Sequence, residues 1–218
     1  MEHPGYDGNT NQYDIGLLFL EESTTLDIEL PRINKGVDFP LAGSITHVLG
    51  WGNTREGGYS VAKELMRVDL NVISNEDCER AELDNDHNYE GAIYEDMMCT
   101  DSGEQDACQG DSGGPLIVRD ENSPNEDILV GVVSWGIGCG VMPGVFSRVS
   151  FGYDWIRSTV CETSNDPPAN LCETRTMEDT ISSWSEILSR SVSVVSVCCV
   201  YYYSCSVLIL VTDILLLL

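Results

Sequence analysis

The chain has 218 residues, with 36 Asp or Glu against 11 Lys or Arg and a formal net charge of −25. Such a surface excludes nucleic acid and anionic membranes as partners, because both are polyanions that need basic surface. The 42% of hydrophobic residues is a globular composition. Nine cysteines with only three histidines and no Cys-x-x-Cys pair favour disulfides over a zinc site, and therefore an extracellular, secreted protein.

Short apolar runs separated by glycine, proline and polar residues make up most of the first 160 residues. Alternating apolar residues over 66–73 are typical of a half-buried strand, and residues 153–160 predict a short helix. The acidic and polar stretch 78–95 is expected to form a surface helix or loop. The acidic run 76–96 is expected to be a solvated face rather than a Ca²⁺ site. Many short strands and almost no long helix predict an all-β barrel or sandwich. Further strands are expected at 15–20, 44–52, 116–118, 128–135 and 145–149.

The character of the sequence changes after residue 160, so we expect one globular domain over residues 1–160. Residues 161–191 are polar and predict a linker, whereas residues 192–218 are apolar and long enough to span a bilayer. A polar spacer before an apolar terminus is also the form of an anchor signal that is removed. A misread coding sequence is the third explanation of this tail.

The run with the most specific chemistry is Gly110-Asp111-Ser112-Gly113-Gly114-Pro115. A nucleophilic serine has to project from a tight turn, and glycines permit that backbone path because they lack Cβ. The N–H groups of Gly110 and Ser112 would then converge as an oxyanion hole for a tetrahedral intermediate. A glycine-rich turn without chemistry is the alternative.

Residues 3–160 resemble the chymotrypsin/trypsin-like serine proteases. The resemblance implies a double six-stranded antiparallel β-barrel with a short C-terminal helix, and most of the first barrel is missing from this chain. The motifs occur in the family's order and at near-family spacing. Besides residues 110–115 they are Tyr13-Asp14-Ile15-Gly16-Leu17-Leu18, Gly50-Trp51-Gly52, Ser134-Trp135-Gly136, Pro143-Gly144-Val145-Phe146 and Tyr153-Asp154-Trp155-Ile156.

The resemblance assigns roles to single residues. It implies that Ser112 is the nucleophile and that Asp14 orients the catalytic imidazole. It places Asp106 at the base of the primary specificity pocket, where a carboxylate selects Arg or Lys; a plain loop acid is the alternative in so acidic a chain. Ser134 is expected to hydrogen-bond Asp14. The implied substrate-binding residues are Asp106, Ser134, Trp135, Gly136 and Gly144.

The resemblance also implies two disulfides, and it implies no metal and no cofactor. The pairs are Cys78–Cys99 and Cys108–Cys139. In the extension, Cys161 and Cys172 are candidates to pair with each other. Three further cysteines, Cys198, Cys199 and Cys205, have no assignable partner.

The pattern departs from the family at the catalytic histidine, which should lie in an Ala-His-Cys sequence well before Asp14. None of His3, His47 and His87 is expected to act as the base. Neither a signal peptide nor an activation site precedes Asp14, so we expect that the natural protein begins upstream of Met1. Without the activation amine, Asp111 is expected to be buried and unpaired. Without a base, the chain as given is expected to have no useful protease activity.

Two functions follow from these observations. The first is a secreted serine endopeptidase that cleaves proteins or peptides after Arg or Lys, anchored to a membrane only if the tail is real. The second is a non-catalytic relative that acts as a binding or regulatory module. Retention of Ser112, Asp14, Asp106 and Gly110 favours the first, because a module without catalytic duty has no chemical need for all four.

Overall fold

The computed structural model describes residues 1–21, 30–58, 61–84, 87–101, 103, 105–119, 127–172, 210–211 and 214–215. The chain forms two compact units, Met1–Cys172 and Glu173–Leu218. Of the second unit, the described part is an antiparallel pair, β10 (Leu210–Val211) with β11 (Ile214–Leu215). The rest of the predicted apolar tail, and the predicted linker from residue 173, lie outside the described residues. None of the helices in the described part has the length and apolarity that a membrane crossing requires.

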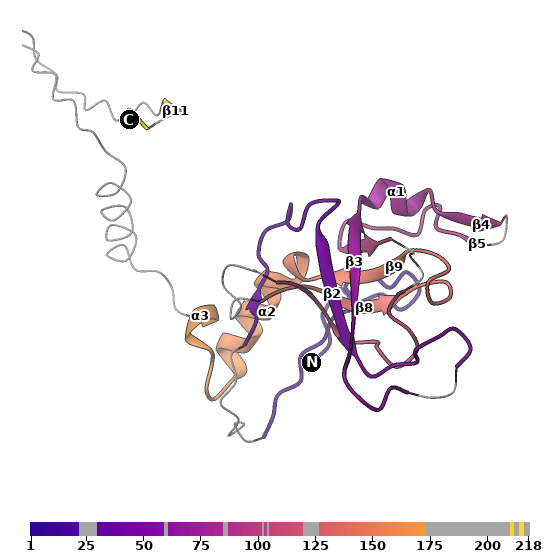
Figure 1. Ribbon diagram of the computed structural model, residues 1–218. Coiled ribbons are helices and arrows are strands. Elements are labelled where there is room, and N and C mark those ends of the chain that lie inside the picture. Colours follow the sequence, from indigo (N-terminus) through magenta and orange to yellow (C-terminus); the bar gives the residue numbers. More distant parts are fainter. Residues whose placement is uncertain are drawn as a thin grey trace, which may run out of the picture. The chain divides into compact units, whose positions relative to one another are not determined.

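Six strands of the first unit close into an antiparallel barrel (Figure 1). Their order is β8–β7–β2–β3–β6–β9, and β9 pairs back onto β8. This confirms the predicted all-β fold, and one of the two expected barrels is present in the described residues. A short strand, β1 (Arg32–Ile33), adds a parallel pairing to β8. The barrel strands are β2 (Ile45–Gly50), β3 (Met66–Ile73), β6 (Met97–Thr100), β7 (Pro115–Val118), β8 (Ile128–Trp135) and β9 (Gly144–Arg148).

The interior of the barrel is packed with aliphatic and aromatic side chains. Side chains alternate between the two faces of a strand, so Leu70 and Val72 of β3 enter the core while their neighbours face solvent. Gly131 of β8 is closely packed, because a Cβ there would lie 3.1 Å from Leu116 Cδ2 and 3.2 Å from Phe146 Cβ. The buried cluster consists of Val48, Leu70, Val72, Met98, Leu116, Val130 and Phe146.

The strand predicted for residues 15–20 is absent, which corrects that expectation. The segment pairs only with the first residues of the chain, through an isolated bridge between Glu2 and Gly16. Ile15 and Leu17 pack on the apolar cluster around the C-terminal helix, whereas Leu18 is 95% exposed. An extended segment becomes a strand only where a neighbouring segment pairs with it over consecutive residues, and among the described residues this segment has only the isolated bridge.

The described part of the acidic stretch 78–95 lies mostly at the surface, as expected. With the residues just before it, the stretch forms α1 (Asn75–Glu79) and a hairpin of β4 (Glu82–Asp84) and β5 (His87–Asn88). Ser74 caps α1, since its Oγ accepts the Asp77 N–H at 3.0 Å. Tyr89, which directly follows the hairpin, is fully buried in a second apolar cluster.

The first unit ends with two helices, α2 (Val149–Thr163) and α3 (Ala169–Cys172) (Figure 1). A disulfide between Cys161 and Cys172 joins them, and Arg157 Nε donates to the Leu171 carbonyl at 3.2 Å. The compact unit therefore includes residues up to Cys172, where the sequence predicts an end at 160.

Replacement of Leu116 tests the barrel core. Leu116 is fully buried in β7, so we expect Leu116→Ala to lower the free energy of unfolding by about 2–5 kcal/mol. Leu83 in β4 is 54% exposed, and Leu83→Ala should change it by less than about 0.5 kcal/mol. Urea denaturation followed by circular dichroism measures both values, and equal losses would contradict this description of the core.

Candidate active site

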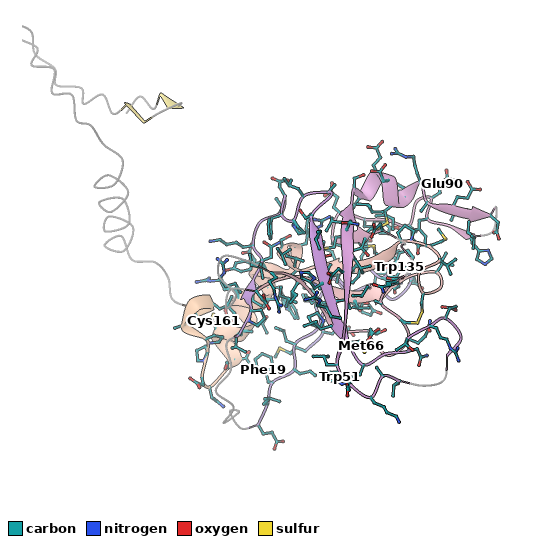
Figure 2. The ribbon with its side chains drawn as sticks, viewed as in Figure 1. Phe19, Trp51, Met66, Glu90, Trp135 and Cys161 are labelled. Atoms are coloured by element: carbon teal, nitrogen blue, oxygen red, sulfur yellow. A yellow bond between two sulfur atoms is a disulfide. The ribbon has the colours of Figure 1, made fainter. Side chains whose placement is uncertain are left out.

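A cavity of about 190 Å³ lies between the segment before β7, the end of β8 and the start of β9. The segment before β7 brings Asp106 and Ser112 to its wall. Trp135, labelled in Figure 2, contributes from the end of β8. The cavity is therefore lined by all the residues that the resemblance assigned to substrate binding, together with the proposed nucleophile. They are Asp106, Ser112, Ser134, Trp135, Gly136 and Gly144.

Asp106 supplies the negative charge of the cavity. Its Oδ1 accepts the Ala107 N–H at 2.7 Å, and its Oδ2 accepts the Gly140 N–H at 3.1 Å. Burial raises the pKa of Asp106 to about 6, against the opposing effect of these two bonds. Within the described part of the chain no lysine or arginine pairs with it. A partly buried carboxylate in this state is suited to bind a cationic group from outside.

Gly144 keeps the approach to this carboxylate open. A Cβ at this position would stand 2.7 Å from Asp106 Oδ1 and 3.3 Å from a ring carbon of Phe146. Any side chain there would occupy the space that a ligand needs to reach the carboxylate.

The turn that carries Ser112 depends on glycine at two positions. Gly110 and Gly113 have φ values of +99° and +80°, a region that side chains other than glycine rarely adopt. The Gly113 N–H donates to the Val133 carbonyl at 2.9 Å, which attaches the turn to β8. Among the described residues, the N–H groups of Gly110 and Ser112 have no acceptor. Within the described part of the chain, the turn that carries Ser112 therefore has two amide donors without a protein acceptor.

Asp111 is paired, which corrects the expectation from the sequence. Its Oδ1 accepts the Gly52 N–H at 2.7 Å, and its Oδ2 accepts the Cys108 N–H at 2.9 Å. A Cβ on Gly50 would lie 2.0 Å from Asp111 Oδ1, so the Gly-Trp-Gly turn is needed for this close approach. Backbone amides take the place of a counter-ion here.

Asp14 is joined to the wall of the cavity through Ser134. The Ser134 hydroxyl donates to Asp14 Oδ2 at 2.6 Å. This bond crosses from the N-terminal segment to β8, 120 residues later. It brings the proposed triad aspartate next to a residue that lines the cavity containing Ser112.

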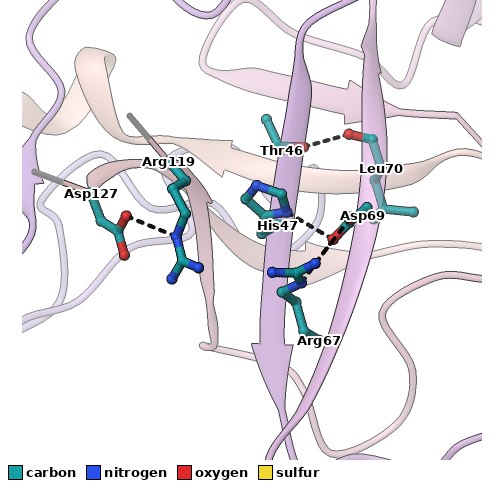
Figure 3. A network of polar contacts seen from close by, with 7 residues as sticks. All are labelled: Thr46, His47, Arg67, Asp69, Leu70, Arg119 and Asp127. Carbon is teal, nitrogen blue, oxygen red and sulfur yellow. Dashed lines mark hydrogen bonds and ion pairs between the residues drawn. The ribbon is translucent and has the colours of Figure 1, made fainter. Parts of the chain in front are cut away.

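The three histidines are bonded at other places. His3 stacks on the Tyr13 ring, with centroids 4.7 Å apart. His47 Nδ1 lies 2.8 Å from Asp69 Oδ1 on the outside of the barrel, where Arg67 also contacts Asp69 (Figure 3). The bond with His47 lowers the pKa of Asp69. His87 Nδ1 lies 2.8 Å from Asp84 Oδ1 in the hairpin.

Disulfides fix the segments that form the site. The structure contains Cys78–Cys99 and Cys108–Cys139, the two pairs that the resemblance implies. Cys108 and Cys139 both line the cavity, so their bond ties the serine turn to the loop after β8.

Tyr89 supports the loop between β8 and β9, and no local sequence pattern indicated this role. Its hydroxyl accepts the Ile137 N–H at 3.0 Å and donates to the Pro143 carbonyl at 2.9 Å. Its ring lies edge-on to Trp135, with centroids 5.0 Å apart. Tyr89 therefore supports the loop that carries Gly140. The Gly140 N–H is the second donor to Asp106, and the sequence did not predict it. The nearest local signal is a glycine directly after Cys139, and in the structure this residue, Gly140, has a φ of +69°.

The raised pKa of Asp106 predicts a dependence of stability on pH. Because the folded chain holds this pKa at about 6, above the unfolded value of about 3.9, the folded state binds the proton more tightly. The favourable contribution of the Asp106 carboxyl group to the free energy of unfolding is complete below about pH 4 and is lost as pH rises through about 6. Relative to Asp106→Asn, the wild-type chain should lose stability between these limits. Urea denaturation across this range measures the difference, and a constant difference would show that burial does not control this carboxyl.

Comparison with known proteins agrees with this geometry. The family model described as Trypsin matches residues 1–156. Trypsin epsilon of Drosophila erecta is 35% identical over 162 residues, covering 73% of this chain and 59% of that protein. Trypsin zeta of Drosophila melanogaster is 40% identical over 162 residues, covering 71% of this chain and 54% of that protein. The chain thus spans between half and three fifths of the length of these relatives. Since the family match covers more than half of the chain, the protein belongs to the trypsin-like serine protease family.

Proposed function

We propose that this chain carries the nucleophile and the specificity pocket of a serine endopeptidase that cleaves protein or peptide substrates after arginine or lysine. The observation that carries the proposal is the Asp106 carboxylate, which shares one cavity with Ser112 and has no cationic partner among the described residues. A guanidinium or ammonium group in the cavity would pair with it. The three disulfides support an extracellular protein, because such bonds persist in oxidising compartments.

The proposed chemistry uses the free groups of the site. With a substrate side chain in the cavity, the scissile carbonyl would lie over the Ser112 hydroxyl, whose oxygen attacks the carbonyl carbon. The N–H groups of Gly110 and Ser112 would stabilise the oxyanion as it forms. The Ser112 proton passes to an imidazole held by Asp14, and the same imidazole returns it to the leaving amine.

We propose that none of the histidines of this chain supplies the catalytic imidazole. His3, His47 and His87 each have other partners, and a serine hydroxyl without a base is a poor nucleophile at neutral pH. We therefore propose that the 218-residue chain binds cations in its pocket without hydrolysing amides. This same observation favours the second candidate function, a non-catalytic binding or regulatory module.

Binding of benzamidine tests the pocket. The aryl amidinium should bind the wild-type chain at pH 7.5, and Asp106→Asn should weaken binding by about 30-fold or more, because loss of one partner of a buried charge pair costs about 2–5 kcal/mol. Affinity should also fall as pH drops below about 6, where Asp106 becomes neutral. Isothermal titration calorimetry measures these changes. The exposed variant Asp69→Asn and the neutral isostere benzamide are the matched controls, and equal affinity of wild type and Asp106→Asn would refute the pocket.

Hydrolysis of an arginine p-nitroanilide tests the missing base. The purified 218-residue chain should release nitroaniline at the rate of Ser112→Ala, measured by absorbance under the same conditions. Hydrolysis by the wild-type chain that Ser112→Ala abolishes would show that this chain contains a working base.

A further inference from the structure

Asp14 lies in a segment that no sheet holds in place. The N-terminal residues pair with it only through short contacts, including His3 N–H to the Ile15 carbonyl at 3.0 Å. The single bond from Ser134 fixes its carboxylate but not the direction of its backbone. A carboxylate that has to orient an imidazole needs a fixed carboxylate group and a fixed backbone.

Asp96 supplies a second attachment for this segment, at Tyr13, the residue directly before Asp14. Asp96 is 4% exposed, and its Oδ2 accepts the Tyr13 N–H at 2.5 Å. Asp96 precedes β6, and its own carbonyl accepts the Arg148 N–H at 2.8 Å. The acceptor of the Tyr13 amide is therefore anchored to the barrel at the end of β9.

The backbone at Tyr13 shows that this attachment restrains the chain. Tyr13 has a φ of +51°, a left-handed conformation that is uncommon for a residue other than glycine and persists when surrounding contacts enforce it. The Ile15 N–H then donates to the Tyr13 carbonyl at 2.7 Å, which closes a tight turn centred on Asp14.

Aromatic contacts hold the side chain of Tyr13, in addition to the contacts that hold its backbone. The His3 ring stacks on Tyr13 at an interplanar angle of 6° and meets Trp155 of α2 edge-on at 4.8 Å. His3 Nδ1 accepts the Gly5 N–H at 3.1 Å, which requires an unprotonated nitrogen. Burial lowers the pKa of His3, partly opposed by the charge of Asp96.

We infer that Asp96 is a positioning residue for Asp14. By accepting the Tyr13 N–H it fixes the backbone on the amino side of the aspartate, so that the carboxylate meets the Ser134 hydroxyl. The inference rests on the proposed role of Asp14. Without Asp96, Tyr13 relaxes to negative φ and the Asp14 carboxylate turns away from Ser134.

A double-mutant cycle on the full 218-residue chain tests the inference. Ser134→Ala removes a hydrogen bond to a charged group, so it should raise the equilibrium constant of unfolding about tenfold in the wild-type background. In the Asp96→Ala background the same change should have less than about a twofold effect, because the bond is already lost. Asp96→Asn keeps an acceptor oxygen and should restore most of the effect of Ser134→Ala.

A control separates coupling from general loss of stability. Thr46→Val removes a buried hydroxyl whose acceptor, the Leu70 carbonyl, belongs to the barrel. Its effect on unfolding should be equal in the wild-type and Asp96→Ala backgrounds. Equal effects of Ser134→Ala in both backgrounds would overturn the inference.

Amide exchange provides a second measurement if Asp96→Ala does not fold. Coupling is reciprocal, so Ser134→Ala should lower the protection factor of the Tyr13 amide about fivefold, with the Val48 amide of β2 unchanged. An unchanged protection factor of the Tyr13 amide would overturn the inference.

Benzamidine binding separates this inference from the proposed pocket. Asp96 does not line the cavity, so its variants should bind benzamidine like the wild type. If Asp96 and Ser134 show no coupling while benzamidine still binds, this inference alone is rejected, whereas absent benzamidine binding rejects the proposed pocket.

Discussion

Strand β8 pairs with β7 along one edge and with β9 along the other, and this double pairing closes the barrel. The site depends on that closure at three points. The end of β8 carries Ser134 and Trp135, its Val133 carbonyl holds the serine turn through the Gly113 amide, and β9 brings Gly144 opposite Asp106. Because the interior behind these residues is tightly packed, small changes in core volume are transmitted to the cavity.

Three acidic side chains near the site are stabilised by backbone amides rather than by basic residues. Asp111 accepts two N–H groups, Asp106 accepts two, and Asp96 accepts one. In a chain with a net charge of −25, basic partners are scarce, whereas amide donors are available at every turn. Amides stabilise a carboxylate without placing a bulky cation in the way. For Asp106 they leave the outward face of the carboxylate open to a ligand.

Local patterns predicted much of this arrangement. The glycines of residues 110–114 indicated a tight turn, and the alternation over 66–73 indicated β3, because each signal is contained within a few neighbouring residues. The predictions failed where the deciding partner is distant in sequence. The Asp111 carboxylate is bonded to an amide 59 residues away, Tyr89 is held by groups 48 and 54 residues away, and residues 15–20 lack a neighbouring strand. Composition carries no information about such partners.

The segment after Asp14 has a consequence for the behaviour of the chain in solution. Leu18 is 95% exposed and Leu20 is 73% exposed, and both belong to no strand. Unpaired backbone with apolar side chains is a template for association with another copy of the chain. At low ionic strength the strong negative charge keeps copies apart. Added salt shortens the range of this repulsion and leaves the apolar attraction in place, so we expect any self-association of this chain to increase with ionic strength.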